Sequence, residues 1–232
     1  MTFATTVAAT VATKIVNMMI TSFPKGEVEH HGNYFSEKIS IKQGVSRKMI
    51  RDEEFIRGNV PMTKQEIRIL TLAVARLEKN SVVVDVGAGT GSITVEAARL
   101  APAGKIFAIE RKAEAVELIK RNVEKFGVSN VTIICAEAPA GLSDLPAADA
   151  VIIGGSGGKI EKILDELKIK KGGRIVVNAI TIQTSAGALD YFRKHCWNYD
   201  AFQVQITRLK KIRAYDMTQA LNPVWIITAE KD

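Results

Sequence analysis

The residues with the clearest chemical potential form a glycine-rich segment, Asp85-Val86-Gly87-Ala88-Gly89-Thr90-Gly91. Glycines let the backbone turn sharply and approach a ligand where any Cβ would collide. A helix is predicted directly after the segment, and its first free N–H groups would face the same ligand. The G-x-G-x-G spacing differs from the G-x-G-x-x-G of dinucleotide folds and from the P-loop. The segment therefore predicts a nucleotide-type site of another kind.

Glu110 supplies an acidic group at the same edge of the predicted sheet. It ends the strand-like run Lys105 to Glu110 and lies 19 residues after Gly91. A carboxylate at this place can accept hydrogen bonds from both hydroxyls of a ribose. The alternative is an ordinary strand-to-helix turn with a solvated glutamate. The glycines, the acid and the strand order together favour a site for a nucleoside-containing ligand.

The elements that must position these residues follow a regular alternation from Asp52 onward. A helix is predicted over 63–77, because Thr63 and Glu66 have capping-box spacing and apolar residues recur behind them at helical intervals. Seven strands are predicted, over 82–86, 105–110, 131–135, 148–153, 174–178, 199–207 and 224–229. Further helices are predicted over 113–126, 159–167 and 184–195, and the stretch after Gly91 is amphipathic.

This alternation of strands and helices predicts the fold class. Apolar strands separated by helices indicate parallel pairing with right-handed crossovers, in a sheet covered on both faces. The last two strands have no helix between them, which indicates an antiparallel hairpin at one edge. The expected fold is α/β, with a doubly wound, mostly parallel seven-stranded sheet.

Length and composition bound the protein class. The 232 residues are 47% hydrophobic and 25% charged, which argues against a disordered chain or a disulfide-stapled miniprotein. The formal net charge of +7 favours an anionic partner, either nucleic acid or a polycarboxylate or phosphate ligand. The two cysteines lack CxxC spacing, so both are interpreted as reduced thiols of a cytoplasmic protein.

The first fifty residues are interpreted as a poorly ordered extension and linker that precedes a single domain over residues 51–232. Residues Thr2 to Phe23 are rich in Ala, Thr and Val, and Lys14 interrupts them. An added helix and a targeting or membrane segment are the alternatives, but a membrane-spanning helix is not expected. The pair His30-His31 lacks further metal-ligand residues around it, so it is interpreted as a solvated loop and no metal site is expected.

Several blocks between Asp52 and Lys231 carry a family resemblance. Beside the glycine-rich segment, the informative blocks are Val60-Pro61-Met62-Thr63-Lys64, Ala108-Ile109-Glu110-Arg111, Glu137-Ala138-Pro139, Ile153-Gly154-Gly155-Ser156-Gly157-Gly158, Asn178-Ala179-Ile180-Thr181 and Asn222-Pro223-Val224. The glycine-rich segment resembles the first motif of class I S-adenosylmethionine-dependent methyltransferases. The other blocks resemble the decarboxylating cobalt-precorrin carbon-15 methyltransferases within that superfamily, which have a Rossmann-like fold.

The resemblance implies roles for the cofactor-binding residues, with S-adenosyl-L-methionine as methyl donor. Those that would wrap its methionine part are Gly87, Ala88, Gly89, Thr90 and Gly91. Glu110 would hold the ribose, and Glu137 with the backbone of Ala138 would meet the adenine. Thr63 would close over the cofactor, unless it serves only as a helix cap. Asp85 would balance the sulfonium charge or only organise the loop.

The resemblance also implies the reaction and its substrate. The expected activity is methylation of carbon 15 of cobalt-precorrin-6B with loss of carbon dioxide from the acetate at carbon 12, in anaerobic cobalamin biosynthesis. Alignment of the reacting atoms suffices, so no catalytic residue is assigned. His195 is given a structural role at a helix end. Substrate contacts are expected from Ser156, Asn178, Arg208 and Lys210. A homotetramer and a separate carbon-5 methyltransferase are expected partners.

Two other function classes remain open at this point. A tRNA or RNA methyltransferase would use the same fold, and the basic charge permits one. Enzymes acting on exocyclic base nitrogens carry an Asn/Asp-Pro-Pro-aromatic motif where this chain has Gly154 to Gly158, so no nucleic-acid partner is expected. The other alternative is a scaffold that binds the cofactor without turnover.

Overall fold

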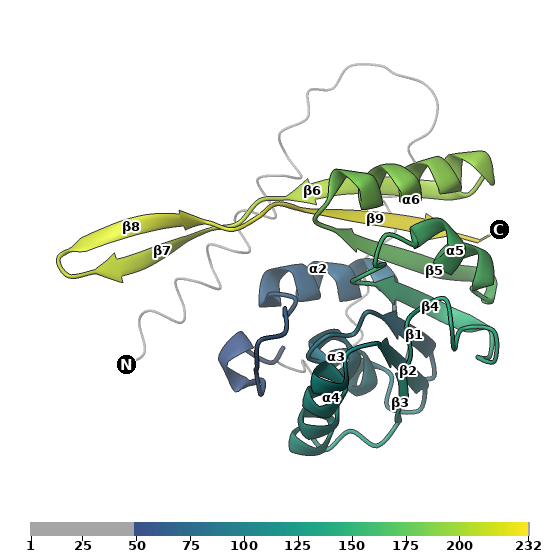
Figure 1. Cartoon of the computed structure of the whole chain (residues 1–232), viewed down its shortest axis with the longest axis horizontal. Helices are drawn as coiled ribbons and strands as arrows, with labels where there is room; N and C mark the ends of the chain where they lie inside the picture. The colour runs from purple at the N-terminus through teal and green to yellow at the C-terminus, as the bar shows by residue number, and fades with distance from the viewer. Residues whose placement is uncertain (1–48, 232) are drawn as a thin grey trace. The chain divides into compact units, whose positions relative to one another are not determined.

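Seven strands form one sheet at the centre of the described part of the chain, residues 49–231 of a computed structural model (Figure 1). The strand order is β3-β2-β1-β4-β5-β9-β6. The first five strands in this order pair in parallel, whereas β9 pairs antiparallel with both β5 and β6. The predicted doubly wound, mostly parallel sheet is confirmed. The extension, linker and histidine pair predicted in residues 1–48 lie outside the described residues.

The elements follow the predicted alternation. The strands of the sheet are β1 (Val82–Val86), β2 (Lys105–Glu110), β3 (Val131–Cys135), β4 (Ala148–Ile153), β5 (Ile169–Ala179), β6 (Asn198–Val204) and β9 (Val224–Glu230). The helices are α2 (Gln65–Ala75), α3 (Ser92–Leu100), α4 (Ala113–Lys125), α5 (Ile160–Glu166) and α6 (Ile182–Lys194), and a single 3-10 turn, η1, spans Asp52–Glu54.

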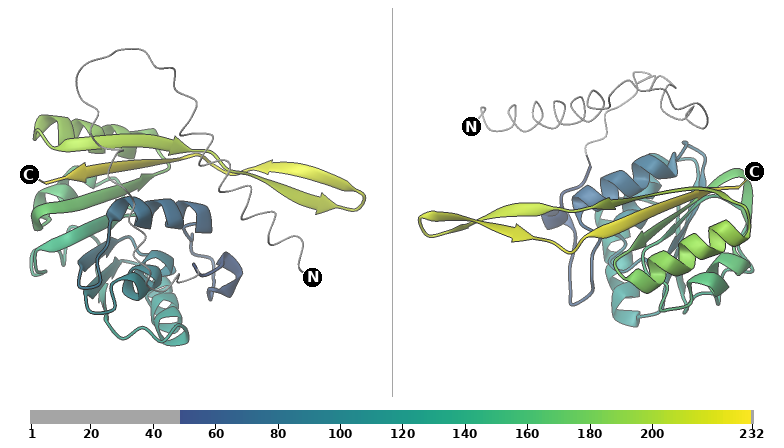
Figure 2. Two further views of the ribbon diagram at one scale, coloured as in Figure 1. Left: turned by 180° about the vertical axis from the view of Figure 1, so that it is seen from behind. Right: turned by 90° about the horizontal axis from the view of Figure 1, so that it is seen from above.

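Helices cover both faces of the sheet and create two apolar cores (Figure 2). Successive side chains of a strand point to opposite faces. Thus Val83 joins the core beneath α2 and α3, while Val84 joins the core beneath α5 and α6. The continuous β-branched runs are buried on both sides for this reason. Ile50, assigned by sequence to the extension, is also buried and belongs to the domain.

The predicted capping box at the start of α2 is wrong. The helix begins at Gln65 with Lys64 as its N-cap, and no side chain caps it. Thr63 instead offers its backbone carbonyl to the guanidinium of Arg68, at 2.8 Å. The helix also ends earlier than predicted, at Ala75, because Arg76 adopts a left-handed conformation.

The predicted antiparallel pairing of the last two strands of the sheet is confirmed, but the first of them is shorter than predicted and an additional element lies between them. The predicted strand 199–207 stops at Val204, and a separate two-stranded sheet follows, made of β7 (Thr207–Ile212) and β8 (Tyr215–Ala220). This β7–β8 arm projects away from the main sheet (Figures 1 and 2). Every residue of both strands is exposed. The sequence therefore lacks the buried-face alternation that would have predicted them.

Candidate functional site

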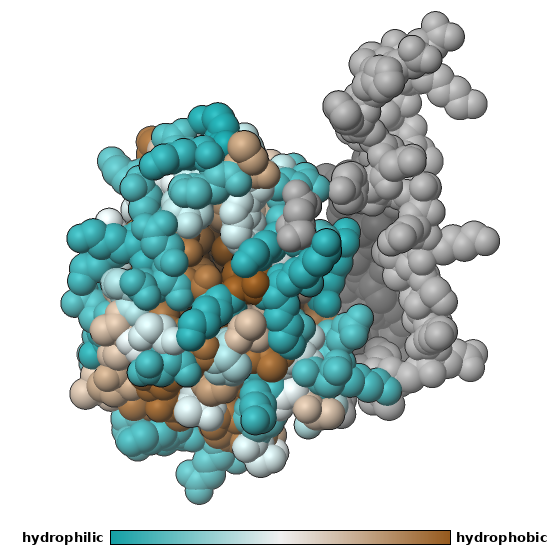
Figure 3. Space-filling model, turned by 90° about the vertical axis from the view of Figure 1, so that its right-hand side faces the viewer, coloured by the Kyte–Doolittle hydropathy of each residue, from teal (hydrophilic) through white to brown (hydrophobic). Residues whose placement is uncertain are grey.

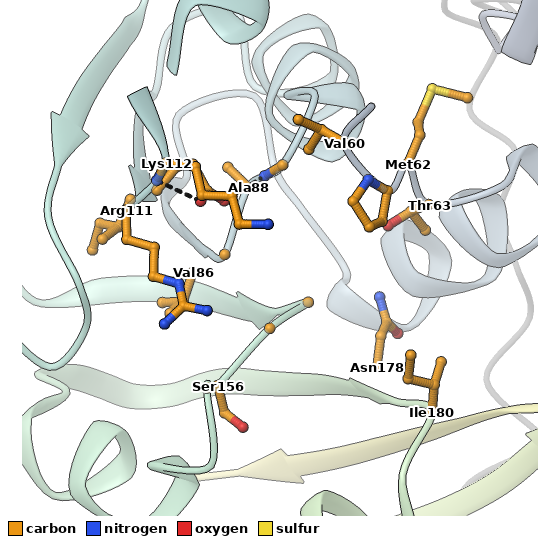
Figure 4. Close-up of a pocket in the computed structure, with 18 of the residues that line it drawn as sticks. Val60, Met62, Thr63, Val86, Ala88, Arg111, Lys112, Ser156, Asn178 and Ile180 are labelled. Carbon is orange, nitrogen blue, oxygen red and sulfur yellow. Dashed lines mark hydrogen bonds between the residues drawn. The ribbon is translucent and has the colours of Figure 1, made fainter. Parts of the chain in front are cut away.

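A cavity of about 480 Å³ lies at the carboxyl ends of the parallel strands (Figure 4). Ala88, Arg111 and Lys112 lie at one end of it, which is called the glycine-loop end below. Thr63 and Asn178 lie at the other, called the far end. This is the edge at which open α/β sheets bind their ligands. Among residues 49–231, no cluster of three or more His, Cys, Asp or Glu side chains could hold a metal ion.

The glycine loop is built for close backbone approach. Gly87 and Gly89 have φ angles of +72° and +58°, in the left-handed region. A Cβ on Gly87 would lie 2.7 Å from the carbonyl oxygen of Gly155, because the loops after β1 and β4 pack against each other. A Cβ on Gly89 would lie 2.9 Å from the carbonyl oxygen of Pro61. Any side chain at these positions would displace the walls of the cavity.

Glu110 organises the loop from the end of β2. Its carboxylate is buried, and it accepts hydrogen bonds from the backbone N–H groups of Gly89 and Lys112, each at 3.0 Å. The two bonds use different oxygens of the carboxylate. Since an ionised carboxylate offers about four acceptor sites, lone pairs remain for a ligand. The carboxylate therefore faces the cavity in a fixed orientation.

Glu137 lies across the same end of the cavity, between two cations. Its Oε1 atom is 3.0 Å from Arg111 Nη1 and 3.1 Å from Lys159 Nζ. The hydrogen bond and charge of Lys159, with a further bond from Arg111, hold the pKa of the Glu137 carboxyl below its ordinary value. The side chain is ionised at neutral pH and can accept a hydrogen bond from an amine.

The strap, defined as Val60–Lys64, closes the cavity opposite the sheet. It is anchored by Arg68 of α2, whose side chain is fully buried. The guanidinium donates to the carbonyl of Thr63 at 2.8 Å, to Asp52 Oδ1 at 3.2 Å and to the carbonyl of Ile50 at 2.6 Å. One helical side chain thus ties the strap and the start of the domain to α2.

The far end of the cavity is mainly apolar. Met62 and Ile180 lie at this end (Figure 4). The other apolar residues that line the cavity include Val60, Pro61, Ile67, Ile206, Leu221 and Val224. Asn178 stands at the end of β5 among them, and its Oδ1 atom accepts a hydrogen bond from the Thr71 hydroxyl at 3.0 Å. This end suits a large, partly apolar molecule whose reacting atom meets a ligand held at the glycine-loop end.

Comparison with known proteins agrees with this geometry. A family model described as "Precorrin methyltransferase domain" matches residues 54–231. The chain belongs to the precorrin methyltransferase family.

Individual members of the precorrin methyltransferase family cover most of the chain. A protein of Sulfurisphaera tokodaii named "Probable cobalt-precorrin-6B C(15)-methyltransferase (decarboxylating)" is 44% identical over 188 residues, which are 78% of this chain and 97% of that protein. The crystal structure of precorrin-6y C5,15-methyltransferase from Geobacter metallireducens is 42% identical with a TM-score of 0.74, and the match covers 78% of this chain and 97% of that one. The crystal structure of precorrin 8W decarboxylase from Methanobacterium thermoautotrophicum also matches with a TM-score of 0.74. Its sequence is 36% identical, and the match covers 78% of this chain and 99% of that one.

The structure of this precorrin methyltransferase brings most of the predicted site residues to one cavity. The predicted residues that line it are Thr63, Gly87, Ala88, Gly89, Glu110, Glu137, Ala138, Ser156 and Asn178. Thr90 and Gly91 are buried behind the loop, at the start of α3. Arg208 and Lys210 lie on β7, and Arg208 forms an ion pair with Glu66 at 2.6 Å. The contacts of these residues with ligands stay predictions.

Sequence reasoning missed several residues that shape the site. Arg111 and Lys112 directly follow Glu110, so their place at a strand end was the available signal. Arg68 and Thr71 gave no signal, because a polar residue between the apolar positions of a helix is ordinarily solvated. His195 stacks on Tyr191 with ring centroids 4.1 Å apart and caps α6, in keeping with its structural assignment.

Asp85 lies beneath the glycine loop, away from the cavity lining. Its carboxylate is buried and accepts a hydrogen bond from the Thr94 hydroxyl at 2.6 Å. Burial raises the pKa of Asp85 from 3.8 to about 6; the bonds from Thr94 oppose this rise, and the charge of Glu110 adds to it. At neutral pH the group is ionised and costs folding free energy.

This raised pKa predicts a pH dependence of stability. Between about pH 4 and pH 6 the native state binds the Asp85 proton and the unfolded state does not. The free energy of unfolding therefore falls as the pH rises through this window, by about 3 kcal/mol from this group. In the variant Asp85→Asn, which has no carboxyl group at this position, the free energy of unfolding should not show this fall. Urea unfolding of both proteins from pH 4 to 7 checks this, and parallel stability curves would contradict it.

Proposed function

We propose that the protein transfers a methyl group from S-adenosylmethionine to carbon 15 of cobalt-precorrin-6B and releases carbon dioxide from the acetate at carbon 12, in anaerobic cobalamin biosynthesis. The observation that carries the proposal is the single cavity that joins a glycine loop and a buried carboxylate to an apolar far end. Membership of the precorrin methyltransferase family and the names of its relatives support the substrate.

The residues at the glycine-loop end fit S-adenosylmethionine, which supplies an already activated methyl group. The loop carries no side chain at Gly87 or Gly89, so its backbone can approach the methionine portion closely. Glu110 is held by two backbone N–H groups with acceptor capacity left for ribose hydroxyls. Glu137 is ionised and suits the exocyclic amine of adenine, with the backbone of Ala138 beside it. Asp85 contributes a negative charge beneath the loop, near a sulfonium.

The far end and the rim beyond it fit a polycarboxylate macrocycle. Ser156 and Asn178 offer neutral polar groups in the cavity. Arg208 and Lys210 add positive charge on β7, and the Arg208–Glu66 ion pair links this strand to α2. The protein needs no strong base for this reaction, because orientation of the two reactants supplies the main effect, about 7–11 kcal/mol in favourable intramolecular models.

The proposal is tested by incubating the protein with purified cobalt-precorrin-6B and S-adenosylmethionine labelled in its methyl group. The expected product has gained one labelled methyl group and lost one carbon dioxide by mass. Transfer of the label to tRNA but to no tetrapyrrole would favour the RNA methyltransferase alternative. Binding of the cofactor without any transfer would favour the scaffold alternative. If the expected product forms, a separate enzyme would methylate carbon 5 in the pathway.

A variant at Glu110 tests the cofactor assignment by itself. Glu110→Ala should weaken S-adenosylmethionine binding by about 1–3 kcal/mol, because hydrogen bonds to a charged acceptor are lost. Isothermal titration calorimetry measures the change. The matched control is Glu117→Ala, which removes an exposed carboxylate from α4 and should leave the dissociation constant unchanged. An unchanged constant in Glu110→Ala would contradict the ribose assignment.

We also propose that copies of the chain assemble through the β7–β8 arm, as a homotetramer by analogy with the family, in the cytoplasm. An isolated two-stranded sheet is marginally stable in water. The arm exposes four large apolar side chains, Leu209, Ile212, Tyr215 and Met217. On the side opposite the arm, shown in Figure 3, hydrophilic side chains cover much of the surface. Free thiols at Cys135 and Cys196 suit a reducing compartment.

The strand register of the arm defines a variant for this test. Lys210 pairs with Met217 and Ile212 with Tyr215, so Ile212, Tyr215 and Met217 share one face. The double variant Tyr215→Asp/Met217→Asp should reduce the mass measured by light scattering to that of one chain. Thr218→Asp adds the same type of charge to the opposite face and should assemble normally. Wild-type protein of monomer mass would contradict the proposal.

A further inference from the structure

A second, smaller cavity of about 320 Å³ adjoins the first at the loop after β4. The two cavities share Gly154–Gly157 and Ile180, and Ile180 lies at the far end of the first one (Figure 4). The start of α6 lines only the second cavity, through Thr181, Gln183 and Thr184. A molecule bound at the far end of the first cavity can therefore extend a side chain into the second.

The start of α6 supplies hydrogen-bond donors at the second cavity. Thr181 is the N-cap, and its hydroxyl accepts the backbone N–H of Thr184 at 3.2 Å. The N–H of Gln183, one residue earlier, has no partner within the helix. The Thr181 hydroxyl donates to the Thr184 hydroxyl oxygen at 2.9 Å, which leaves the Thr184 hydroxyl proton free to donate. Because a helix N-terminus carries a partial positive charge, these groups favour an anionic ligand.

Ser156 supplies an unpaired hydroxyl to the same cavity. The residue is only 8% exposed, and its hydroxyl forms no hydrogen bond within residues 49–231. Unlike Nδ2 of Asn178, the hydroxyl oxygen is not fully covered, so it opens onto a cavity. It points away from Ala88 and Arg111, which line only the first cavity (Figure 4). Buried polar groups are nearly always paired in native proteins, so this hydroxyl indicates a ligand that supplies the partner.

The walls of the second cavity suit one carboxylate on an otherwise apolar molecule. None of the described residues that line it is charged, so no carboxylate of the protein repels the ligand there. Ile180, which is 71% exposed, offers an apolar surface to the molecule that carries the carboxylate. Hydroxyl and N–H donors offset the cost of removing one carboxylate from water.

These donors also decide which carboxylate fits. They stabilise the ionised group in the bound substrate, whereas loss of carbon dioxide moves the negative charge out of the carboxylate. Interactions that are stronger in the ground state than in the transition state slow a step. The second cavity therefore suits a carboxylate that the reaction retains.

We propose that the second cavity binds a carboxylate side chain of the methyl-accepting substrate, one that the reaction retains, through the start of α6 and the Ser156 hydroxyl. The inference rests on the proposed function, since it takes that substrate to be cobalt-precorrin-6B. It adds to that function a fixed contact that orients the macrocycle relative to the methyl donor.

A pair of variants at Thr184 tests the charge of the ligand. Thr184→Glu and Thr184→Gln each form a capping box with Thr181, so α6 should stay intact. The dissociation constant for cobalt-precorrin-6B is measured with S-adenosylhomocysteine present, so that no turnover occurs. At neutral pH, Thr184→Glu should bind the substrate about 10- to 100-fold more weakly than Thr184→Gln, because like charges meet in the cavity. Both variants should retain the affinity for S-adenosylhomocysteine, which shows that they are folded.

The matched control for the added charge is Ile182→Glu. Ile182 lies in the same turn of α6, is 81% exposed and does not line the cavity. Its variant should bind the substrate within about threefold of wild type, because water and salt screen an exposed charge. A loss as large as that of Thr184→Glu would indicate a general charge effect and would overturn the specific site.

The contribution of the hydroxyl is tested by Ser156→Ala. The dissociation constant for the substrate should rise about 10-fold, as expected for one hydrogen bond to a charged group. Ser143→Ala, which removes an exposed hydroxyl outside both cavities, should leave it unchanged. With saturating substrate and S-adenosylmethionine, Ser156→Ala should still release one carbon dioxide for each methyl group transferred. A methylated product that keeps this carbon dioxide would overturn the assignment of a retained carboxylate.

The failures of the two proposals are distinguishable. Wild-type protein that neither binds nor methylates cobalt-precorrin-6B would overturn the proposed function, and this inference with it. Wild-type protein that does both, with equal substrate dissociation constants in Thr184→Glu and Thr184→Gln, would overturn the carboxylate site alone. An unchanged constant in Ser156→Ala would overturn the role of its hydroxyl.

Discussion

Gly87→Ala is expected to abolish measurable S-adenosylmethionine binding and to lower the free energy of unfolding by about 2–5 kcal/mol. Two effects add at this position. The φ angle of +72° is in the left-handed region, where a Cβ costs about 1–2 kcal/mol. The added Cβ would also lie 2.7–2.9 Å from three backbone atoms of Gly155. Backbone atoms cannot rotate out of the way, so the loops after β1 and β4 must separate.

Gly127 provides a matched control for this variant. Its φ angle is +62°, but a Cβ there would meet no heavy atom within 4 Å. Gly127→Ala should therefore show the backbone cost alone and bind the cofactor normally. Urea unfolding and calorimetric titration of both variants separate the two effects. Equal destabilisation of the two proteins would contradict a specific role for the contact between the loops.

The glycine loop and Glu110 show which parts of the site could be predicted from the sequence. The spacing of Gly87, Gly89 and Gly91 after an apolar run predicted a loop at a strand end, because the chemistry of a tight turn is local. Glu110 followed from the alternation of strands and helices, which fixes the edge of the sheet at which it lies. The mostly parallel pairing of the sheet and the glycine-loop end of the cavity were predictable for the same reason.

Long-range pairs were not predictable from one sequence. Thr71 and Asn178 are separated by 107 positions, and Arg68 and Asp52 by 16. Neither pair leaves a local pattern, since each residue by itself is an ordinary polar residue of a helix, turn or strand end. The wrong cap at Thr63 has a different cause. Thr63 and Glu66 have the spacing of a capping box, but the Arg68 guanidinium binds the backbone carbonyl of Thr63 and the helix begins with Lys64 as its N-cap. The β7–β8 arm has no buried face within one chain, so periodicity carried no signal.

Arg68→Met is expected to destabilise the protein by about 3–5 kcal/mol, the usual cost of removing one partner from a buried ion pair. The guanidinium bonds Asp52 and two backbone carbonyls, and it lies over the Phe55 ring at 4.8 Å from the ring centroid. Methionine can fill part of the space but satisfies none of these acceptors. The exposed Arg121 of α4 is the matched control, and Arg121→Met should change the stability by less than about 0.5 kcal/mol.

The same substitution should also weaken cofactor binding, although Arg68 lies outside the cavity lining. Arg68 holds the carbonyl of Thr63, and the carbonyl of Pro61 in the same strap closes over Gly89. When the strap is no longer anchored, part of the binding free energy must be used to order it. The double variant Asp52→Asn/Arg68→Met separates the two contributions, because it leaves no buried charge unpaired. It should regain part of the lost stability relative to Arg68→Met but none of the lost affinity. If urea unfolding and calorimetry show stability and affinity recovering together, the strap would not depend on Arg68 for its position.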